Sequence, residues 1–128
     1  MQAPAELKYS KNDEWIRVED EVATLGITDY AQDQLSDVVF VEIVVLEGDT
    51  LGKGETCAVV ESVKAAADIY LPIGGEILAI NETLVDSPEL INEDPFGEAW
   101  LIKFKISDPG ELESLMDAET YNNLERDH

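Results

Sequence analysis

Branched apolar residues, often alternating with polar ones, dominate the chain and predict a mainly β fold. Such side chains favour strands because they pack well on a pleated, half-buried surface. The predicted strands cover residues 15–18, 22–27, 37–46, 57–60, 69–71, 76–80 and 100–106. The segment 37–46 exceeds the usual strand length, so we expect it to bend. Tyr9 and Trp15 are expected to anchor the core near the start of the chain.

Capping residues predict three helical segments between and after these strands. Residues 28–35 form the first, with Asp29 as N-cap and Gln32 completing a capping box. Ser87 followed by Pro88 predicts a single helical turn. A C-terminal helix over residues 108–125 is predicted to dock on the sheet through a stripe of apolar side chains. That helix begins with the capping pair Asp108 and Glu111, and its stripe consists of Leu112, Leu115, Met116 and Leu124.

Lys64 lies at the centre of a turn of small residues between two predicted strands. The apolar runs 57–60 and 69–71 flank it, which predicts a β-hairpin even though no Asn-Gly or Asp-Gly marks the turn. The side chain would then project into water, followed by alanines that leave room for a second protein. An ordinary surface lysine is the alternative. A flexible stem that ends in a nucleophilic amine suits the covalent attachment of a prosthetic group.

The tetrapeptide at residues 48–51 has an echo at 81–84, in each case after a mainly apolar strand. Two similar β units with Lys64 between them would form a quasi-symmetric sandwich or flattened barrel, although four positions can also match by coincidence. The glycines around Lys53 resemble a phosphate loop only superficially, because no Ser or Thr follows the lysine. Nucleotide binding is therefore rejected.

Length and charge narrow the choice of partners. A chain of 128 residues fits one domain, 1–128, in which residues 1–6 form a short tail. With 8 basic and 29 acidic residues the net charge is −21, which argues against nucleic acid and anionic membranes. It favours partner proteins with basic clefts. With no leader and no apolar run of membrane-spanning length, we expect a cytoplasmic protein.

The chemistry-bearing residues argue against an enzyme. Cys57 is the only cysteine and lies in an apolar run, so we expect a core residue in a reducing compartment rather than a nucleophile. His128 is the only histidine and the last residue, which leaves little for a His-based metal site or catalytic dyad. A non-catalytic role is therefore predicted.

Several segments, taken in order, resemble the H protein of the glycine cleavage system from about residue 7 to residue 121. They cover residues 13–15, 26–32, 37–42, 60–65, 92–97 and 100–101. The resemblance implies a hybrid barrel-sandwich (lipoyl-domain-like) fold with lipoic acid covalently attached to Lys64. It also implies that Glu61 helps lipoylating enzymes to recognise the target. Val63 and Ala65 stand where biotin carriers usually have methionines, which points away from biotin.

The resemblance implies a lipoyl carrier rather than a catalyst. The arm on Lys64 would take an aminomethyl group from glycine decarboxylase (P protein) to aminomethyltransferase (T protein). Electrons would pass to dihydrolipoamide dehydrogenase (L protein), and a lipoyl/octanoyl transferase or lipoate ligase would load the lysine. Glu14 and Asp68 are candidates for a groove that holds the aminomethyl arm, the alternative being that both are solvated surface acids.

Three positions and one segment depart from the family pattern. Asp13 stands where His is usual, Ser36 where Gly is usual, Leu71 where Ser is common, and the usual Leu-Pro-Glu near 44–46 is absent. None of them touches the attachment turn, but Asp13 and Leu71 bear on partner docking and on how the arm is held. Two other roles fit the same sequence: a lipoyl/octanoyl relay that supplies other lipoate-dependent enzymes, and an unmodified interaction module.

Overall fold

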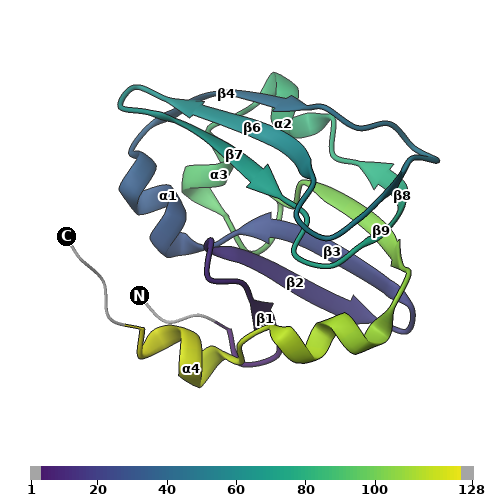
Figure 1. Cartoon of the computed structure of the whole chain (residues 1–128). Helices are drawn as coiled ribbons and strands as arrows, with labels where there is room; N and C mark the ends of the chain where they lie inside the picture. Colours follow the sequence, from purple (N-terminus) through teal and green to yellow (C-terminus); the bar gives the residue numbers. More distant parts are fainter. Residues whose placement is uncertain (1–3, 125–128) are drawn as a thin grey trace.

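The computed structural model describes residues 4–124 and contains two antiparallel sheets packed against each other (Figure 1). The larger sheet has the strand order β1-β2-β3-β9-β8-β5, and the smaller has the order β4-β6-β7. The strands of the larger sheet are Lys8–Tyr9, Glu14–Glu19, Val22–Ile27, Ile102–Ile106, Gly75–Ile80 and Thr50–Leu51. Those of the smaller sheet are Val38–Ile43, Thr56–Ser62 and Ala66–Tyr70. The predicted mainly β, barrel-sandwich class is confirmed.

Strand β4 is shorter than its apolar run predicts. It ends at Ile43, although the backbone N–H of Val44 still donates to the carbonyl of Cys57 over 3.0 Å. Two residues later the N–H of Leu46 donates to the carboxylate of Asp49 over 2.9 Å, which turns the chain toward β5. The pairing of β4 with β6 shifts register between Val38 and Phe40, an irregularity of the kind that bends a strand.

Helix α1 (Asp29–Leu35) is present, but its predicted cap is wrong. Thr28 is the N-cap, and its hydroxyl accepts from the N–H of Ala31 over 3.2 Å. Asp29 is instead the first helical residue and accepts from the Gln32 amide over 2.7 Å. Threonine and aspartate are both accepted N-cap residues, so the backbone path decides between the two neighbours.

Two further helices follow β8, and they overturn the proposed internal repeat. Helix α2 (Thr83–Asp86) was not predicted, and α3 (Leu90–Glu93) begins just after the predicted turn at Ser87. Residues Thr50–Leu51 form a strand, whereas the matching positions 83–84 start α2. The echo in the sequence is therefore a coincidence. No helix within residues 4–124 is long and apolar enough to cross a membrane.

The single C-terminal helix predicted over residues 108–125 is wrong; residue 125 itself lies outside the described residues. A 3₁₀ helix, η1 (Pro109–Ser114), and a short helix, α4 (Ala118–Asn122), take its place. Between them Met116 exchanges two backbone hydrogen bonds with Tyr9, of 2.7 and 2.8 Å, which forces extended backbone there. The capping role of Asp108 is confirmed, because its carboxylate accepts from the N–H of Gly110.

The core has two parts. The main cluster fills the space between the sheets, and the buried Cys57 belongs to it as predicted. A smaller cluster contains the fully buried Tyr9 and Trp15 and lies under α4. The predicted apolar stripe divides accordingly: Leu112 and Leu115 pack on the main cluster, Met116 and Leu124 on the smaller one.

Ser36 ends α1 with φ 65° and ψ −145°, a backbone conformation that suits glycine. The Ser36→Gly variant should therefore be more stable by about 1 kcal/mol, since relief of backbone strain exceeds the added entropy of the unfolded chain. Urea unfolding measures the change. Gln34→Gly, an exposed change inside the same helix, is the control and should lower the stability by about 1 kcal/mol. Equal losses in both variants would contradict this reading of Ser36.

Candidate functional site

Lys64 lies at the tip of the β6–β7 hairpin, as the sequence predicts (Figure 1). The two strands pair without a break from Ala58 and Ile69 up to Glu61 and Ala66, and the side chain of Lys64 is exposed. The hydroxyl of Ser62 accepts from the backbone N–H groups of Lys64 and Ala65, over 3.1 and 3.0 Å. This network fixes the backbone of the tip and leaves the lysine amine in water.

The tip is also tied to the neighbouring strand. The backbone N–H of Val63 donates to the carbonyl of Asp37, just before β4, over 3.1 Å. Glu61 lies at the end of β6, three residues before the lysine, and its side chain is exposed. Lysine and acid therefore occupy one ordered, accessible corner of the small sheet.

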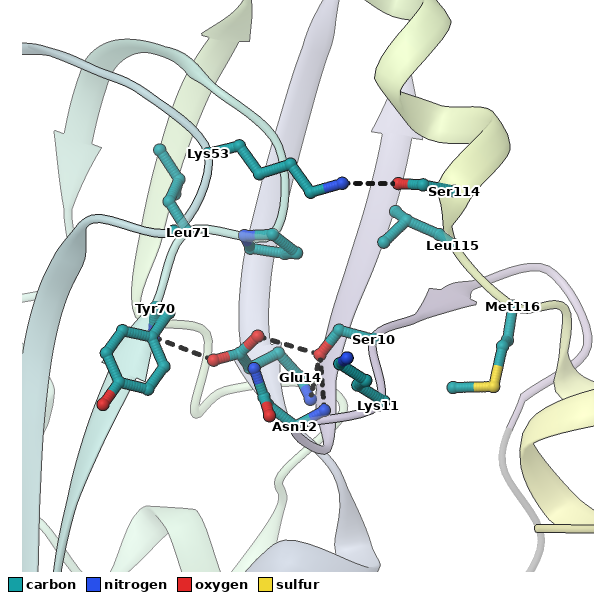
Figure 2. A pocket seen from close by; sticks show the side chains of 12 residues that line it. Ser10, Lys11, Asn12, Glu14, Lys53, Tyr70, Leu71, Ser114, Leu115 and Met116 are labelled. Carbon is teal, nitrogen blue, oxygen red and sulfur yellow. Dashed lines mark hydrogen bonds between the residues drawn. The ribbon is translucent and has the colours of Figure 1, made fainter.

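Glu14 is a buried acid in β2 and not a solvated surface group. Only 1% of its surface is exposed. One carboxylate oxygen accepts from the Ser10 hydroxyl and the other from the backbone N–H of Tyr70, both over 2.8 Å (Figure 2). Burial raises the pKa of Glu14 from 4.5 to about 7, and the two donors limit that rise because they favour the carboxylate.

A cleft of about 420 Å³ opens beside Glu14. Its walls come from the segment before β2, the turn near Lys53, the end of β7 and the segment after η1 (Figure 2). The Lys53 ammonium group donates to the Ser114 hydroxyl over 3.1 Å and so bridges two of these walls. The lining residues are Ser10, Lys11, Asn12, Glu14, Lys53, Gly54, Tyr70, Leu71, Pro72, Ser114, Leu115 and Met116.

The two acids predicted to form a groove lie in different environments: Glu14 is buried beside the cleft, whereas Asp68 is exposed to solvent. Asp68 is exposed on β7, two residues before Tyr70, and does not line the cleft. Sequence reasoning missed Ser10 and Tyr70 as partners of Glu14. Tyr70 uses only its backbone N–H, so no side-chain pattern could have revealed it.

Two departures from the family pattern lie close to this cleft. The carboxylate of Asp13 accepts from the Tyr121 hydroxyl over 2.8 Å, which links the start of β2 to α4. Leu71 is fully buried and gives the cleft an apolar wall. Both positions are therefore structural as well as close to the site.

Comparison with known proteins decides the family. The family model described as glycine cleavage H-protein matches residues 7–128. The chain belongs to this family. A glycine cleavage system H protein of Aeromonas salmonicida is 57% identical over 122 residues, covering 94% of each chain. The Escherichia coli protein of the same name is 54% identical over 125 residues, covering 97% of this chain and 96% of its own.

The family also includes a solved structure with the same fold. The crystal structure of a glycine cleavage system H protein from Mycobacterium marinum superposes with a TM-score of 0.85 at 34% identity. The match covers 95% of this chain and all of that chain. As an H protein, the chain is a non-catalytic lipoyl carrier of glycine cleavage, which works with the P, T and L proteins of that system.

Proposed function

We propose that Lys64 is the lysine that carries lipoic acid in amide linkage. The observation that carries this proposal is an exposed lysine on a tip whose backbone is held by Ser62. The fit is good, because the flanking Val63 and Ala65 are also exposed and leave the amine open to a loading enzyme. Once attached, lipoate would supply a disulfide that can take up the aminomethyl group and is reduced in doing so, and the dithiol left after transfer can return an electron pair as the disulfide re-forms. The chain itself supplies the fixed attachment point.

Glu61 is proposed to guide the enzyme that loads this lysine, a lipoyl/octanoyl transferase or a lipoate ligase. Its exposed carboxylate, three residues before Lys64 at the end of β6, can pair with a basic group on that enzyme.

The protein is also proposed to work in the cytoplasm. Its single cysteine, Cys57, is buried and unpaired, which suits a reducing compartment.

Intact mass followed by peptide mapping tests the attachment. The chain is produced in a host that supplies lipoate and the loading enzymes. One lipoyl group on the peptide that contains Lys64 is the expected result. A lipoyl group on another lysine, a biotin group, or an unmodified chain under these conditions would each overturn the proposal.

Glu14 and Asp68 are proposed to hold the cationic end of the loaded arm. The Glu14 carboxylate beside the cleft is the stronger partner, because it is buried and can pair with an amine away from water. Asp68 is exposed, so it would act near the cleft rather than inside it. As the pH rises through about 7, Glu14 gains its negative charge and should bind an ammonium group more strongly.

The lifetime of the aminomethyl group on the carrier tests this role of the two acids. Glu14→Gln should shorten the lifetime about tenfold, because it removes the buried negative charge and leaves the shape of the side chain. Asp68→Asn should shorten it less, because its carboxylate is exposed. Mass spectrometry over time follows the loss of the group. An unchanged lifetime in Glu14→Gln would remove Glu14 from this role.

A further inference from the structure

A backbone peptide group just before β4 holds the hairpin tip from outside the hairpin. The segment between α1 and β4 lies at the same end of the small sheet as the β6–β7 turn (Figure 1). In this segment the carbonyl of Asp37 accepts from the backbone N–H of Val63 over 3.1 Å. Val63 directly precedes Lys64, so the orientation of this one peptide group affects where the lysine is presented.

The side chain of Asn92, in α3, holds both peptide groups that flank Asp37. Its oxygen accepts from the N–H of Val38 over 2.8 Å, and its nitrogen donates to the carbonyl of Ser36 over 2.7 Å. The N–H of Val38 and the carbonyl of Asp37 belong to the same planar peptide group. A continuous chain of hydrogen bonds therefore runs from Asn92 through this peptide group to Val63, the residue before the lysine.

A second side chain fixes the orientation of the Asn92 amide. The nitrogen of Asn92 also donates to the side-chain oxygen of Gln32, in α1, over 2.9 Å. The nitrogen of Gln32 donates in turn to the carboxylate of Asp29 over 2.7 Å. Because a carboxylate only accepts, turning either amide over would bring two donors or two acceptors together. The Asn92 side chain is therefore held in a single orientation.

We propose that Asn92 is a positioning residue, which holds Lys64 in place for the loading enzyme through the peptide group that follows Asp37. The inference rests on attachment at Lys64. Ser62 fixes the turn within the hairpin, whereas the hydrogen bonds of Asn92 fix the turn relative to α1 and α3. Without them the tip would occupy several positions, and only the fraction in the correct one could bind the enzyme. Such a loss raises the KM for the carrier and leaves kcat unchanged.

Amide hydrogen exchange in the lipoyl-free chain, followed by NMR, tests the positioning without any enzyme. Asn92→Ala should speed the exchange of the Val63 N–H about tenfold, because the carbonyl that accepts from it is no longer held. Loading by purified lipoate ligase, with lipoate and ATP, gives the second measurement. The KM for the carrier should rise about tenfold in this variant, while kcat stays within about twofold.

Asn81→Ala serves as the control, because it removes an asparagine with bonds of the same kind elsewhere in the fold. Asn81 follows β8, and its nitrogen donates to the carbonyls of Glu98 and Trp100, before β9, over 2.9 and 2.7 Å. Both asparagine variants should unfold at lower urea concentrations than the wild-type chain. Asn81→Ala should nevertheless leave the exchange of Val63 and the KM within about twofold of the wild-type values.

Gln32→Ala is a milder variant, which keeps Asn92 and removes a group that orients it. Alanine maintains α1, and the exchange of Val63 and the KM should each rise about threefold. If Asn92→Ala does not fold, Gln32→Ala decides alone. Unchanged exchange at Val63, an unchanged KM, or equal changes in Asn81→Ala would overturn the proposal. Failure of the ligase to load the wild-type chain at Lys64 would overturn the attachment itself, and intact mass detects that separately.

Discussion

Replacing Lys64 with arginine should give a folded chain that accepts no lipoate and supports no glycine cleavage. The guanidinium group of arginine keeps the positive charge but does not act as the attacking amine. The side chain at the tip is exposed and the backbone is held by Ser62, so the stability should be unchanged within about 0.5 kcal/mol. Intact mass measures lipoate attachment, glycine cleavage in the reconstituted system measures activity, and urea unfolding measures stability.

Lys105→Arg is the matched control for this loss. Lys105 is an exposed lysine in β9, on the other sheet, so the variant should be lipoylated and fully active. Lipoylation that survives in Lys64→Arg would show that another lysine is the target. A loss of activity in both variants would show that the assay responds to something other than attachment.

The second large effect concerns Glu14 and the pH dependence of stability. The pKa of Glu14 is about 7 in the folded chain and 4.5 without its surroundings, so the fold favours the protonated form. Its contribution to the free energy of unfolding is fully present below pH 4.5 and is lost as the pH rises through 7. At 1.36 kcal/mol per pKa unit, the contribution is about 3 kcal/mol.

Glu14→Gln should remove this dependence. Glutamine does not titrate in this range. The free energy of unfolding of the wild-type chain should therefore fall by about 3 kcal/mol relative to that of the variant between pH 4.5 and about pH 8. The variant should be less stable overall, because the Ser10 hydroxyl and the Tyr70 N–H share one remaining acceptor. Urea unfolding at several pH values gives the difference curve, and exposed Glu113→Gln controls for net charge. A difference curve that does not change with pH would show that the pKa of Glu14 is not raised by the fold.

The β-hairpin at Lys64 could be predicted from the local sequence alone. The two apolar runs and the small residues between them lie within one short stretch, and the structure pairs them directly. Strands β2, β3 and β9 were predicted for the same reason, because each contains its own apolar residues within a short segment, and in β9 these alternate with polar ones. The hairpin that presents Lys64 could therefore be predicted without knowledge of the rest of the fold.

Long-range contacts account for what the sequence could not predict. The burial of Glu14 depends on Tyr70, which is 56 positions away and offers only a backbone N–H. The C-terminal helix breaks because Met116 pairs with Tyr9, at the other end of the chain. A local reading gives each of these residues its intrinsic preference, and tertiary pairing overrides it.

The hydroxyl of Ser62 holds the backbone at the base of Lys64 through two hydrogen bonds. With lipoate attached at Lys64, as proposed, the bonds of the arm would set most of its reach, because the backbone of the turn is held. An enzyme that receives the arm would then need its reacting groups at a set distance from the turn that contains Lys64. Loss of the Ser62 hydrogen bonds would let the end of the arm occupy a larger volume, so it would reach those groups less often.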